Sequence, residues 1–415
     1  MEKLDYLSDL GVGSVLVGPI YPQTGGSFNA DNLKDIDPVL GDLNDFDDLV
    51  TGLHERGLKL IMDFVPGLPN KNPQQIIEEL KETLKFWLNK GVDGFRVDAD
   101  MDMLDLLREL RLVLDEKTAE DYHPRILMTK SKLANDADLI KFYGTNFTEH
   151  AGDISHMPMN FALIDDLPDA ESVTAQNLDD VVSSYVKSMP NPGAWPNFVL
   201  GVAGKRRVAT RLGHDLVDVM NMVTMLLPGS PITYSGEEIG MLGGGDVPMQ
   251  WDASANAGFS SATPWLPVNT DYEKVKHVCS SLHFCITSSF ESIVSHTHFS
   301  TSVFSQVNVK VQLESEHESH IKIYRALAAL REQPSILFGS FDSVANGTVF
   351  AYCRVKKGNP GYVVAVNLDE EAVSDIDLTG LPMVPDAGLV EVRSHHDRDD
   401  KAKEVERADD EEAVG

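Results

Sequence analysis

The stretch that decides the fold is Gly91-Val-Asp-Gly-Phe-Arg-Val-Asp98, a glycine followed by a short, mainly apolar run that ends in an acid. Its β-branched and aromatic residues favour a strand, and Gly91 ends the helical pattern that precedes it. In that pattern the apolar residues recur at helical spacing and share one face; they are Ile76, Ile77, Leu80, Leu84, Trp87 and Leu88. An amphipathic helix therefore leads into a buried strand with Asp98 at its end.

The same alternation runs from the N-terminus to about residue 245. Strands are predicted at 14–17, 58–65, 92–97, 125–128, near 159–161, 197–200 and 231–234; the helices between them include 45–55, one capped by Asn72, 178–189 and 216–227. About seven such units over roughly 240 residues predict a parallel (β/α)8 barrel. The predicted strands are one fewer than the eight of a complete barrel. Because the chain opens in the helix that should follow the first strand, we expect the barrel to lack that strand.

Beyond about residue 318 the pattern becomes that of an antiparallel β domain. A helix at 321–330 is followed by strands at 348–355 and 361–367, which are separated by Gly, Pro and Asn turns. We therefore expect a barrel domain over 1–318, a small antiparallel β-sandwich over 319–395, and a solvated acidic tail over 396–415.

The composition excludes several classes of protein. The 65 acidic and 35 basic residues give a net charge of −30, which repels phosphate backbones and argues against nucleic-acid binding. With 42% hydrophobic residues the chain can form a core. It shows no secretory signal and no apolar run long enough to cross a bilayer. Three cysteines cannot form a disulfide framework.

Nine short motifs stand in an order that resembles glycoside hydrolase family 13, the family of α-amylases and α-glucosidases. They are Asp35–Pro38, Asp63–Pro66, Gly91–Ala99, Leu127–Thr129, Trp195–Gly201, Pro228–Tyr234, Gly236–Gly240, Met249–Asp252 and Trp265–Val268. The resemblance implies a (β/α)8 barrel followed by a β-sandwich. It also implies that Asp98 occupies the position of the nucleophile, with Arg96 two residues earlier on the same face of the strand. The chemistry requires no cofactor and no metal.

The other catalytic positions of the family are changed. A retaining glycosidase needs a second carboxyl group about 5 Å from the nucleophile to protonate the leaving oxygen. The residue at that position is Lys130, whose ammonium group is far too weak an acid for this role. The third carboxylate position is Gly204. We therefore predict a vestigial site without hydrolytic activity, in which Asp98 persists as a structural partner of Arg96.

Two sugar-contacting positions of the family are changed as well, and one domain is missing. Gly67-Leu68 replace an Asn-His pair, and Phe28-Asn29 replace a Tyr-Asp pair, so binding of a small sugar is doubtful. Only Gly67–Lys71 stand where α-glucosidases carry the B domain, one wall of their sugar pocket.

In lacking both the B domain and the catalytic acids, the chain resembles the heavy chains of heteromeric amino-acid transporters. The resemblance implies the ectodomain of a type II membrane glycoprotein on the extracellular face of the plasma membrane, with a light-chain transporter as partner. The membrane helix would precede residue 1, and Asn146 and Asn346 would be glycosylation sites. An α-glucosidase with a degraded site, or a binding protein without a membrane partner, are the alternatives.

The family pattern breaks between Lys274 and Val307. Deleting 275–306 joins two runs that together resemble an uninterrupted maltase sequence. The hypothesis is that this segment is a foreign insert, a translated intron whose length keeps the reading frame. The alternatives are a genuine surface loop and a metal site at His296 and His298, whose spacing matches no known ligand pattern.

Four basic residues occupy or adjoin positions where the family carries acids: Lys130, Lys205, Arg206 and Arg207. If they meet near Asp98, they could bind an anion. The alternative interpretation is that they form compensating ion pairs within a filled pocket.

Overall fold

The computed structural model divides the chain into two compact units, Met1–Asn160 with Ser188–Pro196, and Phe161–Lys187 with Asn197–Gly415. The residues that it describes are 2–24, 27–28, 32–65, 73–131, 136–145, 152–190, 194–244, 247–273, 283–287, 306–369, 378, 380–381, 387–388, 390–393 and 405–406.

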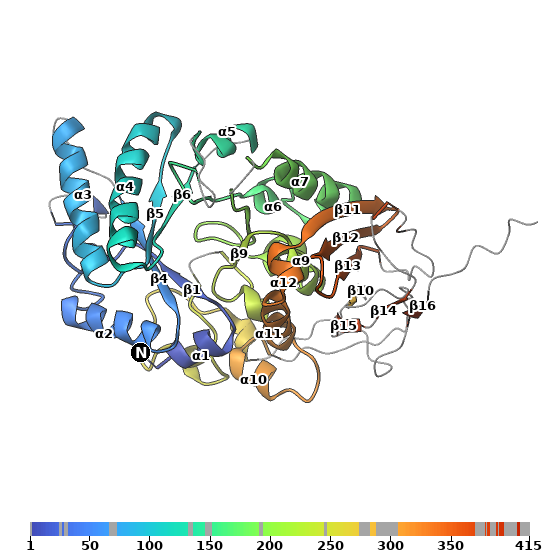
Figure 1. Cartoon of the computed structure of the whole chain (residues 1–415). Helices are drawn as coiled ribbons and strands as arrows, with labels where there is room; N and C mark the ends of the chain where they lie inside the picture. The colour runs from blue at the N-terminus through green and yellow to red at the C-terminus, as the bar shows by residue number, and fades with distance from the viewer. Residues whose placement is uncertain are drawn as a thin grey trace, which may run out of the picture. The chain divides into compact units, whose positions relative to one another are not determined.

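The first unit is built on a parallel sheet in the order β1-β4-β5-β6-β7 (Figure 1). The strands are β1 (Ser14–Val17), β4 (Lys59–Phe64), β5 (Gly94–Asp98), β6 (Ile126–Lys130) and β7 (Met157–Pro158). The helices are α1 (Leu4–Asp9), α2 (Leu43–His54), α3 (Pro73–Asn89), α4 (Leu104–Asp121) and α5 (Asp136–Lys141). A short antiparallel pair, β2 (Gln23–Thr24) and β3 (Ser27–Phe28), follows β1. The predicted strand–helix alternation is confirmed.

Local sequence sets the ends of two of these helices. The Asp42 side chain accepts hydrogen bonds from the backbone N–H groups of Asn44 and Asp45. The Asp45 side chain accepts one from the Asp42 N–H, which completes a capping box at the start of α2. Gly91 follows α3 with φ +94°, a conformation that favours glycine, and a Cβ there would lie 2.7 Å from Val50. The predicted cap Asn72 lies outside the described residues.

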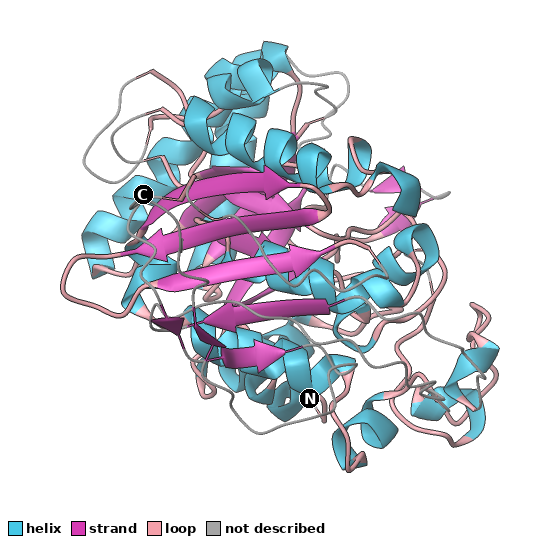
Figure 2. Cartoon of the chain, turned by 90° about the vertical axis from the view of Figure 1, so that its right-hand side faces the viewer, coloured by secondary structure: helices cyan, strands magenta, loops and turns pink. Residues whose placement is uncertain are grey.

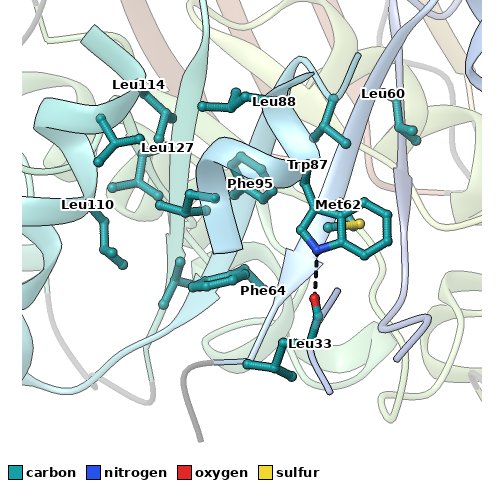
Figure 3. Packing of buried hydrophobic residues seen from close by; sticks show 14 of the residues in the cluster. Leu33, Leu60, Met62, Phe64, Trp87, Leu88, Phe95, Leu110, Leu114 and Leu127 are labelled. Carbon is teal, nitrogen blue, oxygen red and sulfur yellow. Dashed lines mark hydrogen bonds between the residues drawn. The ribbon is translucent and has the colours of Figure 1, made fainter. Parts of the chain in front are cut away.

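The core of the first unit centres on Trp87 of α3 (Figure 3). Its side chain is fully buried, its indole N–H donates to the carbonyl of Leu33 at 2.8 Å, and the rings of Tyr21 and Phe46 meet it edge to face. Figure 3 shows Leu60, Met62, Phe64, Leu88, Phe95, Leu110, Leu114 and Leu127 in the same cluster. Packing of the apolar face of α3 against β4 and β5 thus fixes the strands whose ends carry Asp63 and Asp98.

The second unit continues the alternation with the parallel pair β8 (Asn197–Val199) and β9 (Ser230–Ile232). Its helices are α6 (Ala162–Asp165), α7 (Ala175–Ser188), α8 (Val208–Leu212), α9 (Asp215–Leu226), α10 (Val309–Glu314), α11 (His320–Arg331) and α12 (Pro334–Phe338). Helix α7 begins three residues before its predicted start because Thr174 Oγ1 accepts the N–H of Asn177 and caps the first turn.

An antiparallel sheet forms the C-terminal part of this unit, in the order β11-β12-β13-β10-β15 (Figure 2). The strands are β11 (Ser340–Asn346), β12 (Val349–Val355), β13 (Tyr362–Asn367), β10 (His283–Thr287) and β15 (Val390–Arg393). A smaller pair joins β14 (Ala387–Gly388) to β16 (Val405–Glu406), which lies in the expected acidic tail. Strand β10 comes from the segment expected to be an insert and pairs with both β13 and β15.

Buried side chains of α11 and β12 bind the C-terminal end of α9. Tyr352 Oη donates to the carbonyl of Val223, Arg354 Nη1 to that of Leu226 at 3.2 Å, and Arg331 Nη1 to that of Met225 at 2.6 Å. Burial lowers the pKa of both guanidinium groups to about 10. The carbonyl groups at a helix C-terminus carry partial negative charge, so they stabilise these two buried cations.

Among the residues that the structure describes, no helix is both long enough and apolar enough to cross a membrane.

Candidate vestigial active site

Two ladder pairs bring the candidate catalytic residues together in the first unit. In the register of β4 and β5, Asp63 stands opposite Arg96; in that of β5 and β6, Asp98 stands opposite Lys130. The carboxyl ends of parallel strands meet at one edge of the sheet, which is where barrel enzymes place their chemistry. Two acids and two bases are therefore neighbours at this edge.

Arg96 pairs with Asp63 rather than with Asp98. Its Nε donates to Asp63 Oδ1 at 2.6 Å and its Nη2 to Asp63 Oδ2, and both side chains are largely buried. Burial raises the pKa of Asp63, and the guanidinium of Arg96 opposes that rise. The expected pairing of Asp98 with Arg96 is thus corrected, because the register puts a second carboxylate directly opposite the guanidinium and binds it through two hydrogen bonds.

Asp98 faces Lys130 instead. Lys130 Nζ lies 3.6 Å from Asp98 Oδ2, and the side chains are 33% and 66% exposed. The two groups form an ion pair of opposite charges at a partly exposed position. At the place where a glycosidase needs a proton donor of tuned pKa, this site holds a fixed positive charge.

The third position belongs to the second unit and carries no side chain that could act. Gly204 is exposed, has φ +85°, and a Cβ built there would meet nothing within 4 Å. Lys205 pairs with Asp165 at 2.6 Å. Arg207 is buried, donates to the carbonyl of Ser235, and stacks over the ring of Tyr234 at 4.7 Å. Lys205 and Arg207 therefore have partners within their own unit.

Gly67, Leu68, Asn29 and Asn146 lie outside the described residues, and Phe28 is described only as backbone in β3. Asn346 is exposed at the end of β11, where Gly347 with φ +59° turns the chain into β12. Among the described residues, no group of three or more His, Cys, Asp or Glu side chains could hold a metal ion.

A family model described as the α-amylase catalytic domain matches residues 1–71 and 66–284. The chain belongs to the α-amylase family. The two matched stretches overlap at residues 66–71, where the connection Gly67–Lys71 stands in place of the B domain of α-glucosidases.

The relatives of this α-amylase family member include amino acid transporter heavy chains and maltases. The human amino acid transporter heavy chain SLC3A1 is 26% identical over 92% of this chain and 68% of its own length, and the rat protein of the same name is matched over 57% of its length. Maltase 1 of Drosophila virilis is also 26% identical, over 92% of this chain and 76% of its own. Overall identity therefore does not separate the two functions.

The fold is that of solved family members. The trehalulose synthase MutB of Pseudomonas mesoacidophila superposes with a TM-score of 0.67 at 19% identity, covering 89% of this chain and 85% of that one. This likeness confirms the predicted barrel fold, with an antiparallel sheet at its C-terminal end.

The alignments to the human heavy chain and the Drosophila virilis maltase run over 515 and 522 positions, more than this chain has residues. Both relatives therefore carry residues that this chain lacks, so a missing segment does not distinguish a heavy chain from a maltase.

Two buried charged groups, Asp63 and Glu237, were not predicted from the sequence. The signal for Asp63 is its place inside an apolar strand, because a buried carboxylate needs a partner. Glu237, in the Gly236–Gly240 motif, is 1% exposed and accepts the N–H of Val208 at 3.0 Å. Burial raises its pKa to about 7, and Arg207 opposes that rise.

Glu237 gives a testable pH dependence. Its folded pKa of about 7 lies above the ordinary value of 4.5, so the folded state holds the proton more tightly. Its contribution to stability is therefore present below pH 4.5 and is lost as the pH rises to about 7. We expect the free energy of unfolding of Glu237→Gln, relative to wild type, to rise between pH 5 and pH 8 by on the order of 2 kcal/mol.

Urea unfolding of both proteins across this range measures the difference. The matched control is Glu332→Gln at an exposed position, which should leave the difference flat. A flat difference for Glu237→Gln as well would show that this carboxylate does not titrate there.

Proposed function

We propose that this chain is a non-catalytic member of the α-amylase family that acts through protein contact, as the heavy chain of an amino-acid transporter. The observation that carries the proposal is the pair of Lys130 with Asp98 at 3.6 Å. Loss of one general acid costs about 10² to 10⁴ in rate. Here the donor is replaced by a group of opposite charge, which also holds the candidate nucleophile in an ion pair.

The second unit supports the same conclusion. Retaining hydrolysis needs carboxylates on both sides of the scissile bond, and the third acid of the family helps to orient the sugar. Gly204 and its neighbours Val202 and Ala203 offer no carboxylate, amide or imidazole. Substituting a single side chain therefore cannot restore the full set of catalytic carboxylates.

The activity test is hydrolysis of maltose and of an aryl α-glucoside by the purified chain. We expect the rate to equal that of buffer and to be unchanged by Asp98→Asn. Turnover above background that Asp98→Asn abolishes would instead establish the α-glucosidase. That alternative is favoured by the retained Asp98 and by the equal identity to a maltase.

The proposed partner is a light-chain transporter, and the proposed location is the extracellular face of the plasma membrane. The support is the name of the mammalian relatives, which are transporter heavy chains. Co-purification of a light chain with a full-length, membrane-anchored version tests both. Failure to recover one, together with absence of turnover, would favour a binding protein without a membrane partner.

A further inference from the structure

The residues on either side of segment 275–306 meet at one turn of the second unit. The N–H of Val307 donates to the carbonyl of Asp271 at 3.0 Å, and Asn308 Nδ2 donates to the carbonyl of Tyr272 at 2.9 Å. The two residues joined by each bond are 36 positions apart in the chain. The chain therefore leaves the second unit and returns to it at the same place.

The bond between Val307 and Asp271 has the spacing of a helical turn once the segment is left out. Residues 275–306 are 32 in number, so without them these two residues would be four positions apart. A backbone bond over four positions is that of an α-turn. The chain also enters the segment in helical conformation, because Thr270–Tyr272 form the short helix η5 and Glu273 keeps helical dihedral angles.

The returning side of this turn is held by residues outside the segment. Val307 is 3% exposed and Asn308 is fully buried. Gln250 Nε2 donates to the carbonyl of Val307, and the N–H of Val309 donates to the carbonyl of Gln250 at 3.0 Å. Asn308 Oδ1 accepts the N–H of Val311 at 2.9 Å and caps α10. These contacts remain when 275–306 are removed.

The antiparallel sheet has a core that forms without β10. Strand β10 lies between β13 and β15, but β13 is also paired with β12 through six residue pairs. Buried side chains of β12 and β13 form one cluster; they are Val349, Ala351, Cys353, Val363 and Ala365. Strand β13 therefore keeps a complete ladder and its packing when β10 is absent.

We propose that residues 275–306 are an insertion into a single helical turn of the second unit, and that the chain without them folds into the same unit. Strand β10 is then an addition to the sheet β11-β12-β13 and not a strand on which that sheet depends. This holds for a translated intron and for a genuine loop alike, and it does not depend on the proposed function. The chain has a long form and a short form that share one core.

The experiment compares the full chain with a variant that lacks 275–306, so that Lys274 is joined directly to Val307. A second variant replaces the segment by a short flexible linker of glycine and serine. The measured quantity is the midpoint of urea unfolding. We expect both variants to unfold cooperatively, with midpoints no more than about 0.5 M below that of the full chain.

Asn308→Ala shows whether the turn itself is kept. The substitution removes the bond to the carbonyl of Tyr272 and the cap of α10. We expect it to lower the midpoint by the same amount in the full chain and in the directly joined variant. A smaller effect in the joined variant would show that the turn is not formed there, and would overturn the insertion at a single turn.

The two deletions separate the turn from the sheet. Folding of the linker variant alone would overturn the single turn, because the ends would then need extra chain to meet. Failure of both variants to unfold cooperatively would show that the sheet depends on β10. Amide hydrogen exchange gives an independent readout: we expect β12, which pairs with β11 and β13, to stay protected in both forms. Loss of that protection in the short form would overturn the inference.

Discussion

Arg96→Met is expected to lower the free energy of unfolding by about 3 to 5 kcal/mol. The substitution leaves the Asp63 carboxylate 6% exposed with its bidentate partner gone. Burial already raises the pKa of that carboxyl group, and the loss of Arg96 removes the main interaction that opposes the rise. The folded state must then either keep an unpaired buried charge or take up a proton. Thermal and urea unfolding measure the loss.

A second substitution isolates the ion pair from the loss of packing. Arg96→Met/Asp63→Leu replaces both charges by apolar groups, and we expect it to recover most of the lost stability. The control is Lys130→Met, which breaks the more exposed pair with Asp98 and should cost less than about 1 kcal/mol. A small effect of Arg96→Met, or no recovery in the double variant, would contradict the assignment of Arg96 to Asp63.

Trp87→Ala is expected to cost a comparable 3 to 5 kcal/mol, about the usual loss for a fully buried tryptophan. The indole is 0% exposed and is packed against Tyr21, Phe46 and Phe86, so its removal leaves a cavity among rigid rings. It also leaves the Leu33 carbonyl without its donor. Urea unfolding of the wild-type and variant chains measures this difference in the free energy of unfolding.

Trp265→Ala is the matched control, because it removes the same side chain from a 90% exposed position. It should change stability by less than about 0.5 kcal/mol. If the two variants lose similar stability, the packing in Figure 3 does not hold the first unit together.

Much of the fold could be predicted because its signals are local. Gly91 and the apolar spacing of α3 mark one helix–strand unit, and the same signals recur along the barrel. The place of β10 could not be predicted, because strand order in an antiparallel sheet depends on partners far apart in sequence. The hypothesis that residues 275–306 are a translated intron remains a proposal. Genomic sequence without splice signals at Val275 and Gln306 would refute it.

The candidate site could be predicted as a set of residue types but not as a set of pairs. The motifs identify Asp98, Arg96 and Lys130, and their order along the chain suggests that neighbouring acid and base belong together. Strand register decides otherwise, since it places Asp63 opposite Arg96 and Lys130 opposite Asp98. A one-residue change of register would separate both pairs, and sequence spacing alone does not fix the register.

Reaction with α-glucosyl fluoride tests the loss of catalysis most directly. Fluoride leaves without needing a proton. The substrate therefore tests attack by Asp98 separately from the loss of the general acid at position 130. Any covalent glucosyl intermediate would accumulate, because no carboxylate at position 130 could activate water to release it. Intact-protein mass spectrometry after incubation should show an unchanged mass. A gain of one glucosyl unit that disappears in Asp98→Asn would contradict the account.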